Sequence, residues 1–131
     1  MSVYESYSRD YPIDKVIEKR SNHSIHVLKF IAFNEEIFKE HFINNPVYPG
    51  SLIMNSVLAA GKQLIQDSGA LDGFEVQAIK KASFRKKCTP GDLLDITLTV
   101  QSIEEQMKIN FLVKSYFEQE VIANGTCFYG R

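Results

Sequence analysis

The sequence is poor in cysteine, lacks any long apolar run and carries almost no excess charge. Its two cysteines, Cys88 and Cys127, provide neither a disulfide framework nor a metal-ligand spacing. No stretch approaches the roughly 18 apolar residues of a membrane helix, and the polar segment from Met1 to Asp10 is unlike a signal peptide. A net charge of −1 gives no bias toward nucleic acid or anionic lipid. These absences predict a cytoplasmic protein with reduced thiols, which are expected to act as small buried hydrophobic groups, although a catalytic thiol is an alternative.

The composition is that of one folded domain, which we expect to span residues 1–131. Hydrophobic residues make up 44% of the chain and charged residues 24%, values typical of a globular protein. A chain of this length leaves little room for a second hydrophobic core.

One long helix is predicted, from Ser51 to about Gly69. Ser51 is expected to cap its N-terminus and Gly69 its C-terminus. Apolar residues surround most of its first three turns, so the helix is expected to be buried on most sides. Asn55 is the polar side chain that stands out in this apolar run.

Strand-like alternation dominates the rest of the chain. It covers Ile25–Phe33, Glu75–Lys86, Leu94–Gln101, Met107–Lys114 and Val121–Tyr129. The strongest turn is Thr89-Pro90-Gly91-Asp92, because proline fixes φ at one central position and glycine accepts positive φ at the next. Consecutive strands joined by short turns predict an antiparallel sheet, and together with one helix they predict an α+β fold.

Three segments resemble the bacterial 3-hydroxyacyl-(acyl-carrier-protein) dehydratases. The most specific runs from His41 to Leu52, where a His-Phe pair, a proline and a Pro-Gly pair precede the apolar helix. Tyr11–Val16 resembles that family's opening strand, and Phe84-Arg85-Lys86 with Thr89–Asp92 resembles a later segment. The segments keep the family's order and spacing from about Tyr11 to the end of the chain. The resemblance implies a hotdog fold, in which an antiparallel sheet wraps around one long central helix and two subunits usually join their sheets.

The chemistry of dehydration requires residues of the types found in this motif. A base must remove the proton at C2, and an acid must assist the departing hydroxyl. The resemblance assigns the base to His41, whose side chain exchanges protons near neutral pH. It assigns the stabilisation of the enolate-like thioester oxygen to the backbone N–H of Gly50, at the helix N-terminus. It also implies a substrate-binding set of Phe42, Pro49, Ser51, Met54 and Leu58.

The sequence departs from the family pattern at Asn55. Fourteen residues after the histidine the family carries a carboxylate, contributed to the neighbouring subunit's histidine across the dimer interface. The carboxamide of Asn55 cannot be a general acid, although it can hold a water, a hydroxyl or a carbonyl group. The small pair that usually follows His-Phe is also replaced, by Ile43-Asn44.

Three hypotheses follow from this departure. In the first, His41 with Asn55 and a water still supports dehydration of acyl thioesters in fatty-acid or polyketide-type synthesis. In the second, the protein is a hotdog thioesterase that hydrolyses acyl-CoA or the acyl thioester of an acyl carrier protein. In the third, it is a catalytically degenerate subunit that binds acyl chains or completes a heterodimer with a carboxylate-bearing paralogue.

The expected partners follow from the resemblance. The phosphopantetheine arm of an acyl carrier protein or CoA enters with the substrate, and no metal or nucleotide cofactor is implied. A homodimer, or a higher oligomer of dimers, is expected. The basic side chains that form a candidate landing surface for an acidic carrier protein are Lys80, Lys81, Arg85, Lys86 and Lys87. The alternative is a solvated strand, because alternating residues cannot all share one face.

Overall fold

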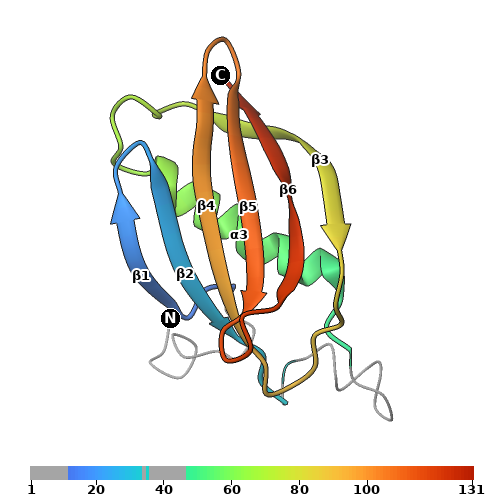
Figure 1. The fold of residues 1–131 in the computed structure, drawn as a ribbon. Coiled ribbons are helices and arrows are strands. Elements are labelled where there is room, and N and C mark those ends of the chain that lie inside the picture. The colour runs from blue at the N-terminus through green and yellow to red at the C-terminus, as the bar shows by residue number, and fades with distance from the viewer. Residues whose placement is uncertain (1–11, 34, 36–46) are drawn as a thin grey trace.

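The computed structural model describes residues 12–33, 35 and 47–131. In this part of the chain, one helix and six strands form the expected α+β arrangement (Figure 1). The elements are β1 (Lys15–Arg20), β2 (Ser24–Phe30), α3 (Gly50–Ile65), β3 (Glu75–Phe84), β4 (Leu93–Ile103), β5 (Met107–Ser115) and β6 (Val121–Gly130).

The strands form one antiparallel sheet in the order β1-β2-β4-β5-β6-β3. Hairpin turns join β4, β5 and β6, so these three strands are neighbours in the sequence and in the sheet. The chain leaves the sheet after β2, forms α3 behind it, and returns as β3 at the far edge beside β6 (Figure 1). The helix therefore lies across one face of a curved sheet.

The core lies between α3 and that face. The helix contributes Ile53, Val57, Ala60 and Leu64, and it packs against β2 and β4. Alternate residues of the strands point toward it, as in β4, where Leu94, Ile96 and Leu98 are fully buried. The other side of α3 is only partly covered, because Leu52, Met54, Leu58 and Ala59 are half-buried. The expectation that the helix is buried on most sides is therefore wrong for a single copy of the chain.

Both ends of the helix differ from their prediction. The helix begins at Gly50 after Pro49, whose φ of −64° and ψ of 144° are those of an extended residue, and no side chain of the described residues caps it. Ser51 is not the N-cap, because the proline before Gly50 already sets the extended entry and Ser51 lies in the first turn. At the other end the helix stops at Ile65, and Gly69 lies beyond it with a φ of +60°.

Lys19 of β1 stabilises the C-terminal end of the helix. Its Nζ donates hydrogen bonds to the carbonyl oxygens of Gln63, at 2.8 Å, and Gln66, at 2.6 Å. These are carbonyl groups that a helix leaves unsatisfied at its end, where a positive charge is favourable. The contacts of Lys19 thus take the place of the glycine cap that was predicted from the sequence.

A buried ion pair lies at the end of β2. Lys29 has the inward orientation of Ile25 and Val27, and its side chain is 1% exposed. Its Nζ lies 2.8 Å from Oε1 of Glu35, whose side chain is 2% exposed. Burying two charges costs several kcal/mol for each ion, and the contact between the two opposite charges offsets part of this cost. It fixes Glu35 to the strand six residues ahead of His41 in the sequence.

We expect Lys29→Met to lower the free energy of unfolding by about 3 kcal/mol, because it leaves the Glu35 carboxylate buried without its ammonium partner. Lys29→Met/Glu35→Met, which removes both charges, should recover most of that loss. Urea denaturation of the three proteins measures the effect. A double variant as unstable as the single one would contradict the ion-pair explanation.

Candidate functional site

A cavity of about 460 Å³ lies at the N-terminal end of α3. It is bounded by the segment entering the helix, by Gly50 and Ile53 of the helix, and by the end of β3 with the loop that follows. Tyr48 joins two of these walls, because its backbone N–H donates to the carbonyl of Cys88 at 2.7 Å. This bridge fixes Pro49 and Gly50 beside the end of β3.

The helix N-terminus is open toward hydrogen-bond acceptors. Leu52 and Ile53 donate their backbone N–H groups to the carbonyl of Pro49. Among the described residues none accepts a hydrogen bond from the N–H of Gly50 or Ser51, and the first turn contains no acidic residue. Free N–H groups and the helix dipole favour negative charge at this end. The geometry suits a thioester oxygen that becomes negative during a reaction.

The Phe84 ring lies against Gly50 at this end of the helix, and sequence reasoning did not include it in the site. A Cβ built on Gly50 would lie 3.0 Å from Cε1 of the Phe84 ring, so the glycine lets the ring approach the backbone closely. The ring is 48% exposed and lines the cavity. Phe84 appeared in the sequence only as part of a resembling segment, and its contact with Gly50 depends on how β3 returns to the helix.

The five basic residues of the candidate carrier-protein surface do not share one environment in the structure. Lys80 lies 4.9 Å above the ring of Phe128. Lys86 is paired with Glu118 at 2.6 Å and Glu120 at 2.5 Å, and these hydrogen-bonded carboxylates raise the pKa of its ammonium group. Lys81 has a φ of +58° where the β3–β6 register is irregular. Arg85, Lys86 and Lys87 line the cavity at the helix N-terminus. The positive charge nearest the site is therefore contributed by these three residues.

The predicted helix residues share the partly covered side of α3. Asn55 and Ser51 are exposed, and Met54 and Leu58 are half-buried. Asn55 is thus not a buried amide satisfied by the core, which was the alternative explanation for it. His41 and Phe42 lie outside the described residues.

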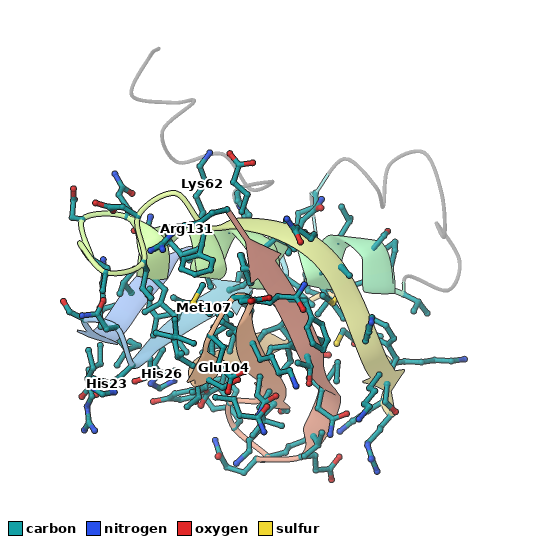
Figure 2. All side chains as sticks on the ribbon, turned by 90° about the horizontal axis from the view of Figure 1, so that it is seen from above. His23, His26, Lys62, Glu104, Met107 and Arg131 are labelled. Atoms are coloured by element: carbon teal, nitrogen blue, oxygen red, sulfur yellow. The ribbon has the colours of Figure 1, made fainter. Side chains whose placement is uncertain are left out.

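The two histidines that the structure describes are separate from this site. His23 lies in the β1–β2 turn, and His26 lies on β2 with Nε2 2.5 Å from Oδ1 of Asp95. Both are on the outer side of the sheet, whereas Lys62 marks the helix side (Figure 2). Within the described ranges, no histidine side chain is therefore near the N-terminus of α3.

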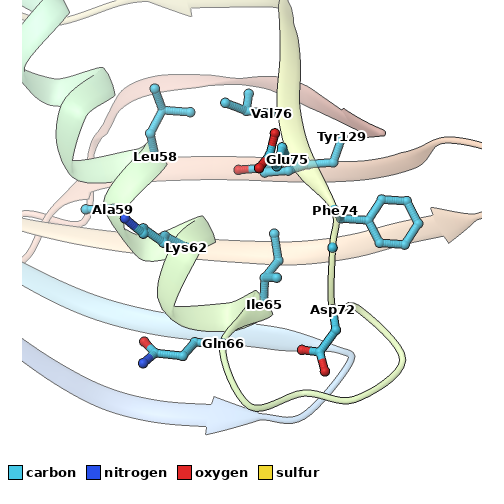
Figure 3. A pocket seen from close by; sticks show the side chains of 11 residues that line it. Leu58, Ala59, Lys62, Ile65, Gln66, Asp72, Phe74, Glu75, Val76 and Tyr129 are labelled. Carbon is cyan, nitrogen blue, oxygen red and sulfur yellow. The ribbon is translucent and has the colours of Figure 1, made fainter. Parts of the chain in front are cut away.

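A second cavity, of about 720 Å³, lies between the C-terminal half of α3 and the start of β3. Its lining is mainly apolar and includes Leu58, Ile65, Val76 and Tyr129, with Lys62 and Glu75 among the charged groups (Figure 3). The side chain of Tyr129 extends from β6 toward the helix. The phenol is 3% exposed, and burial raises its pKa, with a smaller contribution from the Cys127 thiol.

The loop before β3 closes the end of this second cavity, and Arg131 holds that loop. Its guanidinium donates to the backbone carbonyls of Ala70, at 2.7 Å, and Asp72, at 3.2 Å. It also lies 4.2 Å from the centre of the Phe74 ring. The position of Arg131 on the helix side of the sheet can be followed in Figure 2.

A curved antiparallel sheet with one helix across its face is the hotdog fold, and solved structures share it. The chain superposes on the dehydratase heterocomplex ApeI:P of Xenorhabdus doucetiae with a TM-score of 0.66 and 15% identity, covering 89% of this chain and 97% of that one. It superposes on zebra fish thioesterase superfamily member 2 with a TM-score of 0.70 and 11% identity, covering 87% and 78%. At these identities the likeness concerns the fold alone.

Sequence relatives define the family more closely. Residues 12–129 match the model of the FabA-like domain. The chain is 35% identical over 102 residues to the 3-hydroxyacyl-[acyl-carrier-protein] dehydratase FabZ of Lactococcus lactis, with 75% of this chain and 68% of the relative covered. The chain therefore belongs to the FabA-like family, and it is a hotdog protein of the 3-hydroxyacyl-(acyl-carrier-protein) dehydratase type.

Other classes of site find no support in the part of the chain that the structure describes. It contains no cluster of three or more histidine, cysteine, aspartate or glutamate side chains placed to hold a metal ion. No helix in the described ranges has the length and apolar character needed to cross a membrane.

We expect Cys88 and Cys127 to resist alkylation by iodoacetamide in the native protein at mildly alkaline pH. Both thiols are buried, and burial raises the pKa of Cys88 to about 12 and that of Cys127 to about 11. The reactive thiolate is therefore much scarcer than at an exposed cysteine. Mass spectrometry should find no label in buffer and two labels in urea. Rapid native labelling of Cys88, which lines the first cavity, would support the catalytic-thiol alternative.

Proposed function

We propose that the protein is a 3-hydroxyacyl-thioester dehydratase acting on chains carried by phosphopantetheine. The observation that supports this most directly is the helix N-terminus, where the N–H of Gly50 has no acceptor among the described residues and the Phe84 ring lies beside it, in a chain of the FabA-like family. The L. lactis relative is a dehydratase of this kind by name.

In the proposed mechanism, His41 removes the proton from C2 of the 3-hydroxyacyl thioester. The electrons of the broken C–H bond move toward the thioester carbonyl, and the N–H of Gly50 stabilises the negative oxygen. The C2–C3 double bond forms as the hydroxyl leaves C3, takes up a proton and becomes water. The proton comes from His41 or from a water that Asn55 orients, because the carboxamide has no acidic proton to give.

We further propose that the working unit contains two copies joined at β3. Val76, Ile79 and Phe84 pair with the buried residues Tyr129, Cys127 and Ala123 of β6, so they face the helix side of the sheet. They are nevertheless 39–48% exposed, since α3 packs over β2 and β4. A second chain alongside this edge strand would cover these side chains and the open face of α3 that carries Asn55.

Two alternatives have specific support. The thioesterase alternative is supported by the zebra fish neighbour and by Asn55, which can position a water against a carbonyl held by Gly50. The degenerate-subunit alternative is supported by the neighbour described as a dehydratase heterocomplex and by the missing carboxylate. In that case a carboxylate-bearing paralogue would replace one of the two copies.

We expect His41→Ala to reduce enoyl formation from a 3-hydroxyacyl thioester by at least roughly a hundredfold, because general acid–base catalysis contributes about 10²–10⁴-fold. Spectrophotometry follows the enoyl product, and a thiol reagent follows release of the carrier in the same samples. His23→Ala, in the exposed β1–β2 turn, is the matched control and should retain the wild-type rate.

The effect of Asn55→Glu tests the role of the missing carboxylate. Restoring an acid should raise the rate of dehydration if His41 and Gly50 are in place. Thiol release without enoyl formation would establish the thioesterase alternative instead. Inactivity of the wild type in both assays, followed by activity on adding a carboxylate-bearing paralogue, would establish the heterodimer.

We expect light scattering after size exclusion to give twice the chain mass of 14.9 kDa. Ile79→Glu should dissociate this dimer, because it places a charge among the half-exposed apolar residues of β3. Ile17→Glu makes the same change in β1, at the opposite edge of the sheet, where the side chain is 45% exposed, and should leave the dimer intact. Dissociation by Ile17→Glu but not by Ile79→Glu would place the dimer interface at the β1 edge and would contradict the proposed β3 interface.

A further inference from the structure

The segment from residue 85 to residue 88 connects β6 to the chain that enters the helix. At its start, the backbone N–H of Arg85 donates to the carbonyl of Ile122 at 2.7 Å. At its end, the carbonyl of Cys88 accepts the hydrogen bond from the N–H of Tyr48, and both of these residues are buried. Lys86 lies between the two contacts.

The side chain of Lys86 connects this segment to the turn between β5 and β6. Its Nζ donates to Oε2 of Glu118 at 2.6 Å and to Oε2 of Glu120 at 2.5 Å. The turn and the end of β3 lie at the same end of the sheet, because Phe84 pairs with Ala123 near the start of β6 (Figure 1). One ammonium group therefore holds the wall of the first cavity against the neighbouring turn.

The β5–β6 turn presents its two carboxylates from a hydrogen-bonded backbone. The N–H of Ser115 donates to the carbonyl of Glu120 at 2.9 Å, and the N–H of Gln119 donates to the carbonyl of Ser115 at 2.7 Å. The side-chain amide of Gln119 also donates to the carbonyl of Tyr116 at 2.7 Å. A single exposed ion pair between flexible side chains contributes little, whereas two carboxylates on such a turn restrict the ammonium group to one place.

The position of segment 85–88 affects the first turn of α3 from two directions. Tyr48, which is bonded to Cys88, is followed by Pro49, whose ring restricts its φ, and then by Gly50. Phe84, which directly precedes the segment, has its ring against Gly50. A shift of the segment would therefore move both contacts, and with them the N–H of Gly50.

We propose that Lys86 is a positioning residue for the oxyanion site at the N–H of Gly50. Held by Glu118 and Glu120, it keeps segment 85–88 in the place from which Cys88 and Phe84 fix the entry of the helix. This role differs from that of a surface charge that attracts an acidic carrier protein, because two carboxylates already neutralise the ammonium group. The inference rests on the proposed function for the identity of the reaction.

The kinetic test uses a 3-hydroxyacyl thioester of pantetheine, without a carrier protein, so that carrier docking cannot affect the rate. We expect Lys86→Gln to lower kcat for enoyl formation about tenfold and to change KM less than about twofold, because an oxyanion donor acts mainly in the transition state and its outright removal costs roughly 10²–10³-fold. Lys86→Arg, which retains the charge and can donate to both carboxylates, should recover most of the rate.

Two comparisons separate the position of Lys86 from its charge. Lys87 lines the same cavity and has no ion-pair partner among the described residues, so Lys87→Gln measures the effect of the charge alone. The loss of kcat in Lys86→Gln should exceed that in Lys87→Gln by at least about fivefold, because the effect of an unpaired exposed charge is screened. Glu118→Gln/Glu120→Gln should reproduce the loss, and adding Lys86→Gln should not deepen it. Equal losses in the two lysine variants, or additive losses with the glutamates, would overturn the proposal.

Hydrogen–deuterium exchange measures the positioning without any reaction. The amide of Tyr48 is protected by its bond to Cys88, so we expect it to exchange about fivefold faster in Lys86→Gln, because the opening of this segment becomes easier. Lys87→Gln should leave this exchange at the wild-type rate. The amides of β4, in the middle of the sheet, report global unfolding and should not change. An unchanged rate at Tyr48 in Lys86→Gln would overturn the proposal.

The two measurements separate this inference from the proposed function. A wild type without enoyl formation, in which Lys86→Gln still accelerates exchange at Tyr48, would reject the dehydratase and support the role of Lys86 in placing the helix N-terminus. Enoyl formation with wild-type kcat and wild-type exchange in Lys86→Gln would support the dehydratase and reject only the role of Lys86.

Discussion

The contact between α3 and strands β2 and β4 determines where the other functional features lie. Because the helix is held over this side of the sheet, its N-terminus meets the end of β3, where Phe84 lies over Gly50. The same placement leaves β3 and one side of the helix uncovered. The two cavities, the exposed Asn55 and the apolar edge strand are all consequences of a helix that covers only part of its sheet.

Small residues allow the close contacts in this arrangement. Gly50 admits the ring of Phe84, and Gly61 admits the phenol of Tyr129 from the opposite layer. Gly50 lines the first cavity, so the absence of a side chain shapes the helix surface there. The buried Lys29–Glu35 pair fixes a third point, where the chain leaves β2.

Much of the fold could be predicted from the sequence. Periodicity indicated the strands and the helix, and the Pro90-Gly91 turn has the predicted geometry, with a φ of +97° at the glycine. The His41–Leu52 segment indicated the family, which the match over residues 12–129 confirms. These features are local, because each depends on residues close together in the chain.

The features that could not be predicted depend on contacts across the fold. Lys19, more than forty residues away, binds carbonyl groups at the C-terminal end of the helix, and the local sequence does not indicate this contact. Lys29 interrupts the apolar alternation of its strand, and its ion pair with Glu35 in the folded chain accompanies its burial. From the sequence alone, Tyr129 is an ordinary aromatic residue of a strand. The contact of its hydroxyl with Gly61 depends on how α3 packs on the sheet. The assignments of His41, Asn55 and Gly50 remain predictions.

The anchoring of the loop before β3 by Arg131 links the residue that follows β6 to the wall of the second cavity. Two backbone carbonyls and the Phe74 ring hold this guanidinium, and the loop they belong to walls the second cavity. A change at the end of β6 would therefore act on the wall of this cavity, although Arg131 is 61 residues from Ala70 and 59 residues from Asp72 in the sequence.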